Sequence, residues 1–177
     1  MRSDLKEVPV QFNADLPYPK IEVDTENLQY ANLIQINYAG MVSEFSAITQ
    51  YTYHEIKLFE DYADVTPTLM GIAEVEMHHM QILGELIVVL GGDPGYWINK
   101  KNKKLNWSPN FVQYGTTLKE MLTYDIESEK AAIAQYRKTA NQIQDENIIA
   151  IINRIILDEE HHLKLLNGLY EKYITSK

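Results

Sequence analysis

Cysteine is absent from the 177-residue sequence. This absence excludes disulfides, a thiolate nucleophile, iron–sulfur clusters and cysteine-based zinc sites. Long hydrophobic runs are absent too, because the longest, residues 82–90, is interrupted by Gly84 and Glu85 and is too short to cross a bilayer. The first residues lack the apolar stretch of a signal peptide. We therefore expect a soluble cytoplasmic protein with no membrane partner.

Positive charge is scarce as well. The chain has 16 Lys and Arg against 25 Asp and Glu, a net charge of −9, which disfavours nucleic-acid binding. We interpret the lysine-rich run at residues 100–104 as a solvated loop. Hydrophobic residues make up 45% of the chain, and this length and composition suit one domain with a sizeable core.

Histidine is rare, yet four of the five histidines fall in two similar places. Glu76 precedes His79 by three positions, and Glu159 precedes His162 in the same way. Residues three apart share a face of an α-helix, so the carboxylate and imidazole of each pair project together.

Both pairs lie on apolar stripes whose steps alternate between four and three residues. The first stripe is Ile72, Glu76, His79, Leu83, Leu86 and Leu90. The second is Ile148, Ile152, Ile155, Glu159, His162, Leu166, Leu169 and Tyr173. Burying a charged carboxylate is costly unless a partner compensates it. Two inward Glu-x-x-His pairs therefore suggest that the partner is metal.

The chain also repeats itself elsewhere. Residues 43–51 and 128–136 align with Ser, Glu, Ala, Ile, Gln and Tyr in the same places. Each half of the chain thus supplies one Glu followed by one Glu-x-x-His, which predicts a pseudo-twofold dinuclear site. The predicted metal ligands, which are also the predicted catalytic residues, are Glu44, Glu76, His79, Glu129, Glu159 and His162.

The four carboxylates of this set balance two divalent ions. Oxygen donors with one imidazole per metal suit Fe or Mn better than a closed structural zinc site. We expect two carboxylates to bridge the metals. Sequence reasoning leaves Fe and Mn open, because both accept this donor set.

Periodicity predicts an all-α fold, with no competing strand pattern. The expected helices cover residues 25–61, 66–91, 117–143 and 145–173. The start signals are Asp24 or Thr25, Thr66 before Pro67, a capping box from Thr117 to Glu120, and Asp145; the second helix ends at Gly91 and Gly92. Residues 93–115 form a connection long enough to cross the whole bundle. We expect an extended N-terminal arm over 1–24, able to lie on a neighbouring subunit, and a four-helix bundle over 25–177.

Several further residues carry hypotheses. Tyr51 and Tyr136 are expected either to bond a ligand carboxylate or to donate an electron. Asp158 could orient a ligating His on the facing helix, although Val75 holds the equivalent place in the other half. His54 is expected to be an ordinary, partly exposed histidine. His78 and His161 are expected either on the surface or in contact with the metal ligands without binding metal themselves.

These residues resemble the ferritin-like superfamily, in its bacterioferritin and rubrerythrin branch. The resemblance covers residues 28–173. The matching motifs are Glu44 with Ala47-Ile48 and Gln50-Tyr51, Glu76-Met77-x-His79, Asp125-Ile126-x-x-Glu129 and Asp158-Glu159-Glu160-x-His162. The resemblance implies an antiparallel four-helix bundle with one long crossover and a di-iron centre that reacts with O2 or peroxide. Manganese catalases share this bundle and similar ligand pairs.

The sequence departs from the branch in three places. Rubrerythrins carry a cysteine-rich rubredoxin domain, whereas this chain has no cysteine. They place a further metal-binding Glu where this chain has Ala132. Bacterioferritins have a short fifth helix that helps close a 24-subunit shell, and this chain ends about fifteen residues after His162, within or just past its last expected helix.

These observations lead to a ranked set of hypotheses. The first is a di-iron oxidoreductase that reduces peroxide or O2 with oxidation of Fe(II), using an unidentified electron donor. The alternatives are a dimanganese catalase, an iron-binding or storage protein, and a structural bundle with a relict site. We expect a small oligomer, a homodimer. Haem is not expected, although Met77 stands where bacterioferritins place a haem-binding Met.

Overall fold

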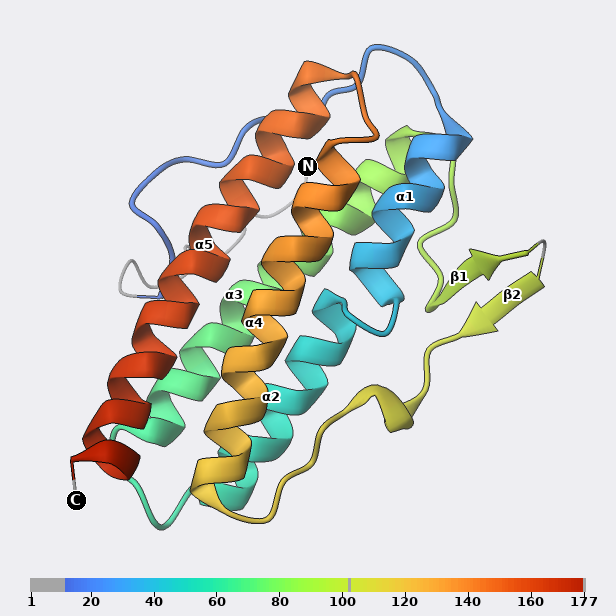
Figure 1. The fold of residues 1–177 in the computed structure, drawn as a ribbon. Coiled ribbons are helices and arrows are strands. Elements are labelled where there is room, and N and C mark those ends of the chain that lie inside the picture. The colour runs from blue at the N-terminus through green and yellow to red at the C-terminus, as the bar shows by residue number, and fades with distance from the viewer. Residues whose placement is uncertain (1–11, 102, 177) are drawn as a thin grey trace, which may run out of the picture.

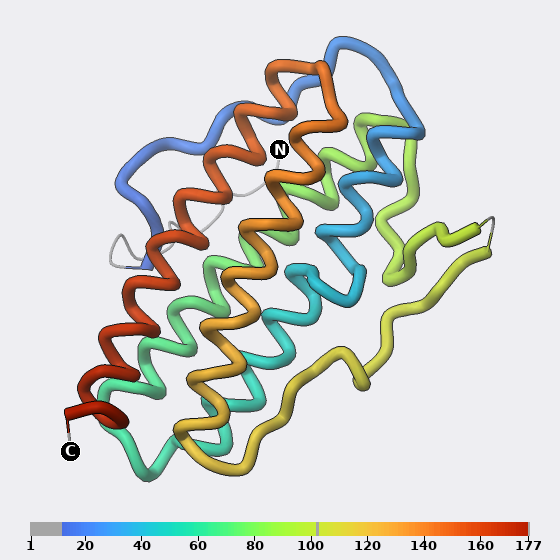
Figure 2. Tube along the Cα trace, in the orientation of Figure 1, coloured from blue at the N-terminus to red at the C-terminus, as the bar shows by residue number. Residues whose placement is uncertain are grey.

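The structure is a computed structural model that describes residues 12–101 and 103–176. It is an all-α, ferritin-like four-helix bundle, as the sequence predicted (Figure 1). The helices are α1 (Leu28–Ala39), α2 (Glu44–Leu58), α3 (Val65–Val89), α4 (Leu118–Ala140) and α5 (Glu146–Tyr170). The α2 helix packs along α3, and α4 packs along α5. Each pair is antiparallel, and the crossover from α3 to α4 runs the length of the bundle (Figure 2).

The first predicted helix is two helices, because the chain breaks between residues 39 and 44. Gly40 ends α1, and a Cβ atom there would lie 2.4 Å from the carbonyl oxygen of Ile36. Ser43 caps α2: its hydroxyl accepts from the Ser46 amide and donates to the Gly40 carbonyl, 2.8 Å away. This capping makes Glu44 the first residue of α2.

Other helix ends follow the sequence signals with small shifts. Asn27, rather than Asp24 or Thr25, caps α1 by accepting the amides of residues 29 and 30. Asp64 precedes α3, so this helix begins before the predicted Thr66. Gly91 ends α3 at φ 83°, the left-handed conformation that glycine adopts without strain.

The two later helix starts match their predicted caps. Thr117 and Glu120 form the reciprocal capping box of α4. The side chain of Asp145 accepts the amides of Asn147 and Ile148 at the start of α5. The α5 helix ends at Tyr170, and a single π-helical turn, Glu171–Thr175, continues from it.

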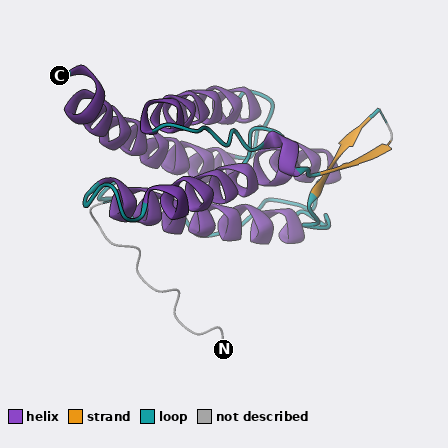
Figure 3. Cartoon of the chain, turned by 90° about the horizontal axis from the view of Figure 1, so that it is seen from below, coloured by secondary structure: helices purple, strands orange, loops and turns teal. Residues whose placement is uncertain are grey.

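The crossover is more ordered than the loop predicted at residues 93–115. It contains an antiparallel hairpin of β1 (Trp97–Lys100) and β2 (Lys103–Asn106), followed by a short 3-10 turn, Pro109–Phe111. The hairpin extends beyond the helices (Figure 3). Trp107 anchors the crossover to α2, because its ring lies 4.5 Å from the Phe45 ring and its indole donates to Ser46 Oγ at 2.9 Å.

The N-terminal arm is described from residue 12; residues 1–11 lie outside the described part. Residues 12–24 contain no helix or strand. They run along α5 of the same chain: Arg154 Nε donates to the Leu16 carbonyl at 2.8 Å, and the Asp24 amide donates to Asp145 at 2.9 Å. The arm was expected to be able to cover a neighbouring subunit, but these residues cover their own bundle.

The core is divided into two apolar clusters along the bundle. One contains Leu83 and Leu86 of α3 with Ile148 and Ile152 of α5. The other contains Leu69 and Ile72 of α3 with Leu166 and Leu169 of α5. Residues 76–79 and 159–162 lie between the two clusters, so the predicted site sits at mid-height inside the bundle. Across the described residues, no helix is both long and apolar enough to span a bilayer.

Candidate metal centre

All six predicted ligands meet inside the bundle. They come from four helices: Glu44 from α2, Glu76 and His79 from α3, Glu129 from α4, and Glu159 and His162 from α5. Every one is buried, with at most 3% of its surface exposed. Burial of six ionisable side chains in one layer is costly unless they compensate one another or hold metal.

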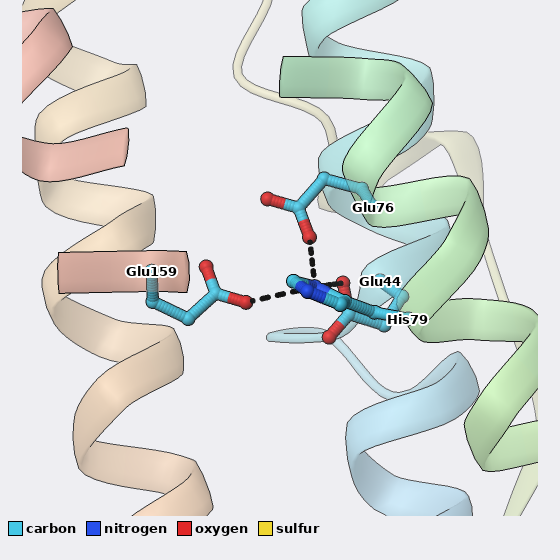
Figure 4. A group of neighbouring side chains, drawn as sticks. All are labelled: Glu44, Glu76, His79 and Glu159. Carbon is cyan, nitrogen blue, oxygen red and sulfur yellow. Dashed lines mark hydrogen bonds and ion pairs between the residues drawn. The ribbon is translucent and has the colours of Figure 1, made fainter. Parts of the chain in front are cut away.

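One half of the site gathers around His79, as Figure 4 shows. His79 Nδ1 lies 3.0 Å from Glu76 Oε2 and 3.3 Å from Glu159 Oε1. Glu44 Oε2 lies 3.9 Å from the same nitrogen. These four residues offer three carboxylates and one imidazole to a single point.

The other half gathers around His162 in the same manner. His162 Nδ1 lies 3.0 Å from Glu76 Oε1 and 3.7 Å from both Glu129 Oε2 and Glu159 Oε2. Glu76 and Glu159 therefore present one oxygen to each half, whereas Glu44 and Glu129 serve one half each. Two carboxylates thus face both halves and two face one half each, which is the placement that two bridging and two terminal ligands would need.

Unpartnered polar atoms test whether metal fits this layer. Within the part of the chain that the structure describes, five buried atoms of this layer have no hydrogen-bond partner: Glu76 Oε1, Glu129 Oε2, Glu159 Oε1 and both ring nitrogens of His162. Glu76 Oε1 and His162 Nδ1 lie 3.0 Å apart without hydrogen-bond geometry. Buried polar atoms rarely lack partners, and ligand atoms that face a common point are those that an ion would satisfy. The residues thus form a dinuclear carboxylate–histidine site suited to Fe or Mn.

Without metal, the layer balances its charge with protons. Burial and the neighbouring carboxylates raise the pKa of Glu44 and of Glu129 well above their usual range. Burial alone would lower the pKa of the His79 and His162 imidazoles, but the surrounding carboxylates outweigh it and raise both pKa values well above normal. Burial also opposes the charge of Glu76, but contacts with the two imidazoles lower its pKa overall.

Two tyrosines link the halves reciprocally. The Tyr51 hydroxyl of α2 donates to Glu129 on α4, and the Tyr136 hydroxyl of α4 donates to Glu44 on α2. Both rings are buried. The predicted hydrogen bonds to ligand carboxylates are therefore present, and each holds a terminal carboxylate in place from the opposite half.

The support behind the imidazoles is one-sided. His79 Nε2 lies 2.9 Å from Asp158 Oδ2. Because the carboxylate accepts the Nε2 proton, Nδ1 of His79 is left to face the site. The residue equivalent to Asp158 is the apolar Val75, and no described residue is a hydrogen-bond partner of His162 Nε2. The orienting role predicted for Asp158 matches this contact.

The prediction for His54 is wrong. Its side chain is fully buried, with Nδ1 2.9 Å and 3.0 Å from the two oxygens of Asp125. Its Nε2 lies 2.8 Å from the Gln113 carbonyl and 3.1 Å from that of Tyr114. Burial raises the pKa of Asp125, and His54 partly offsets that rise. The pair ties the end of the crossover to α2 and α4.

Gln50 connects this pair to the site. Its amide nitrogen donates to Asp125 at 2.9 Å and to Ser128 at 3.1 Å, and its oxygen accepts from the Gln113 amide at 3.0 Å. The only sequence signal for these contacts is that Gln50 and Ser128 belong to the repeated motif. The partners lie more than 60 residues apart, so helix periodicity could not pair them.

A cavity of about 370 Å³ opens beside the carboxylates. It lies between α2 and α4 and is bordered by Asn110, Phe111 and Gln113 of the crossover. Its walls contain repeat-related small and polar residues, namely Ala47 and Ala132, and Gln50 and Gln135. Four ligands, Glu44, Glu76, Glu129 and Glu159, line it. A small molecule in this cavity would reach the carboxylate face of the site.

The remaining candidates lie outside the ligand layer. Met77 is 50% exposed and borders a surface groove with Met80 and Val88. The His78 ring packs edge-on against Tyr18, with centroids 4.7 Å apart. His161 is half-buried on α5.

Comparison with known proteins shows the family of the chain and proteins that share its fold. A family model described as rubrerythrin matches residues 36–170. A protein named probable manganese catalase, from Clostridium acetobutylicum, is 25% identical over 173 residues, covering 86% of this chain and 75% of the relative. A manganese catalase structure from Anabaena has a TM-score of 0.79 at 19% identity, covering 91% of this chain and 80% of the other. The bacterioferritin structure from Desulfovibrio desulfuricans, described with its diiron site, has a TM-score of 0.68 at 22% identity, covering 82% and 81%.

Proposed function

The chain belongs to the rubrerythrin family, and we propose that it is a redox enzyme that consumes hydrogen peroxide at a dinuclear metal centre. The observation that carries the proposal is the pair of overlapping ligand sets. Glu76 and Glu159 offer an oxygen to each set, and a cavity reaches both carboxylates from outside the ligand layer. Two ions that share bridging ligands can exchange two electrons with one small molecule.

Manganese is the metal we favour, and disproportionation of peroxide is the reaction. Sequence reasoning ranked di-iron peroxide reduction first and the dimanganese catalase second. The relative named as a probable manganese catalase supports reversing that order. In the proposed reaction two H2O2 give two H2O and one O2, with no external electron donor. One peroxide is reduced and the other is oxidised, so electrons and protons balance within the pair.

A di-iron peroxidase is the second candidate. The likeness to a bacterioferritin described with a diiron site favours it, and the donor set accepts iron as well as manganese. In that reaction one H2O2 and two protons give two H2O, while two Fe(II) become two Fe(III). It requires an electron donor to restore Fe(II).

The metals, when bound, supply the electrons and a Lewis-acidic surface for peroxide. The chain supplies geometry and proton control. The cavity between α2 and α4 admits a small polar molecule to the carboxylate face. Tyr51 and Tyr136 hold the terminal carboxylates, and Asp158 fixes which nitrogen of His79 faces the site. The apolar clusters above and below exclude bulk water from the layer.

Metal exchange separates the two candidates. The metal-free protein would be loaded with Mn²⁺ or Fe²⁺ and given H2O2, with O2 release followed by electrode and Fe(II) oxidation by near-ultraviolet absorbance. We expect the Mn-loaded protein to release one O2 per two H2O2. If only the Fe-loaded protein consumes peroxide, at two irons per peroxide, the second candidate is correct. If neither form consumes peroxide, the proposed function is wrong.

A further inference from the structure

The Asp158 carboxylate accepts hydrogen bonds from three groups in addition to its contact with His79. Its Oδ1 accepts from the Ala14 amide at 2.7 Å and from Arg154 Nη1 at 2.6 Å. Its Oδ2 accepts from the Tyr18 hydroxyl at 2.5 Å and faces His79 Nε2 at 2.9 Å. A carboxylate has about four acceptor positions, so that of Asp158 is fully used. Two of the four donors belong to the N-terminal arm.

The arm is itself fixed by the same cluster. Arg154 donates from Nη2 to the Ala14 carbonyl and from Nε to the Leu16 carbonyl, both at 2.8 Å. Its guanidinium lies over the Tyr18 ring, 4.1 Å from the centroid. The Arg154 side chain is 4% exposed, whereas the arm residues that it contacts are half-buried or exposed. Arm, arginine and carboxylate form one network that begins at the surface and ends on buried His79.

The other half of the site has no counterpart to this network. Val75 occupies the place of Asp158, and buried Nε2 of His162 has no partner among residues 12–101 and 103–176. A carboxylate behind a ligating imidazole fixes its tautomer and raises its basicity, and its loss typically lowers metal affinity about 10–100-fold. His79 has this support and His162 lacks it, although the donor sets around them are otherwise equivalent.

We propose that the N-terminal arm is a clamp that makes the two metal positions unequal, with the His79 position the tighter one. The Tyr18 hydroxyl and the Ala14 amide hold Asp158, and Asp158 holds His79. Loss of the arm contacts frees Asp158 and weakens that position alone. By linkage, an ion at the His79 position stabilises the docked arm by the same factor. This inference rests on the dinuclear centre proposed above.

The test uses the full chain and Zn²⁺, a diamagnetic probe that accepts oxygen and imidazole donors. Metal-free protein with ¹⁵N-labelled histidine would be titrated while the His79 and His162 ring nitrogens are followed by NMR. Competition with a chelator gives a dissociation constant for each position. We expect two separate steps in the unaltered protein, with His79 responding first.

Two variants and one control separate the arm from the carboxylate. Tyr18→Phe keeps the ring over Arg154 and removes only the hydroxyl, so it should weaken the His79 step several-fold. Asp158→Asn should weaken the same step about 10–100-fold. Tyr30→Phe is the control, because its hydroxyl accepts from the Gln144 amide, 3.2 Å away, and not from any group of the Asp158 network described above. The His162 step should be unchanged in all three.

Hydrogen exchange at the Ala14 amide gives an independent reading. Zn²⁺ should slow this exchange in the unaltered protein and in Tyr30→Phe, and less so in Asp158→Asn. Three results would overturn the clamp while leaving the dinuclear centre intact. They are equal affinities at the two positions in the unaltered protein, equal weakening of both binding steps in Asp158→Asn, and an unchanged His79 step in Tyr18→Phe. Failure of the unaltered chain to bind any ion would overturn both.

Discussion

Metal loading should release protons, and the shifted pKa values of the ligands give the reason. In the metal-free layer the pKa values of His79 and His162 are raised by surrounding carboxylates, despite their burial. Those of Glu44 and Glu129 are raised by burial and by neighbouring carboxylates. These shifts favour the protonated forms of the four groups, whereas the lowered pKa values of Glu76 and Glu159 favour their charged forms. Divalent ions compete with these protons for the same ligand atoms.

The sign of the effect follows from these shifts. Loading two Mn²⁺ should release several protons per chain, and the affinity for both ions should rise with pH while the ligands remain protonated. Calorimetric titration in buffers of different ionisation enthalpy measures the released protons. Release of one proton or none would refute the charge assignment of the layer.

The same shifts fix the sign of the pH dependence of stability. A group whose pKa is raised in the fold contributes stability at low pH, and that contribution is lost as the pH rises through the folded pKa. His79, His162, Glu44 and Glu129 all belong to this class. The contribution of these four groups to the free energy of unfolding of the metal-free protein should therefore fall as pH rises through their folded pKa values. Bound metal should remove this decline, which denaturant titration with and without Mn²⁺ would show.

Three substitutions extend the account. Glu129→Ala should lower metal content from two ions per chain toward one, by elemental analysis, because it removes a terminal ligand of the His162 half; retention of two ions at full affinity would exclude Glu129 as a ligand. Ala132→Leu should narrow the cavity and lower kcat/KM for peroxide several-fold with two ions still bound; unchanged kinetics would exclude this cavity as the access route. His54→Ala should cost about 3–5 kcal/mol in urea unfolding, because it removes the imidazole from the buried Asp125 carboxylate and from two carbonyls and leaves the Gln50 amide as the donor to Asp125; a loss below about 1 kcal/mol would contradict that role.

The bundle and the ligand layer were predictable because both depend on local spacing. Glu76 and His79 share a helix face three positions apart, and the same is true of Glu159 and His162, so the apolar stripe alone directs them inward. The repeat around Glu44 and Glu129 then supplied the other two ligands. The capping box at Thr117 is equally local, because its two bonds join residues three apart.

The features that were missed depend on contacts distant in sequence or on single caps. His54 is buried only because Asp125, 71 residues away, and the crossover carbonyls meet it. The arm reaches Asp158 across 140 residues through Tyr18. The break at Gly40 falls inside the first predicted helix, residues 25–61, and helix periodicity did not reveal it. Choice between Fe and Mn is not encoded in the donor set, because both metals accept it.

Anomalous X-ray scattering at the manganese edge, from crystals of the Mn-loaded protein, tests the central claim most directly. The account predicts two ions per chain in the layer between the apolar clusters. Glu76 and Glu159 should each bind both ions, while Nδ1 of His79 and Nδ1 of His162 bind one ion each. A single ion in this layer, or two ions held by other residues, would contradict it.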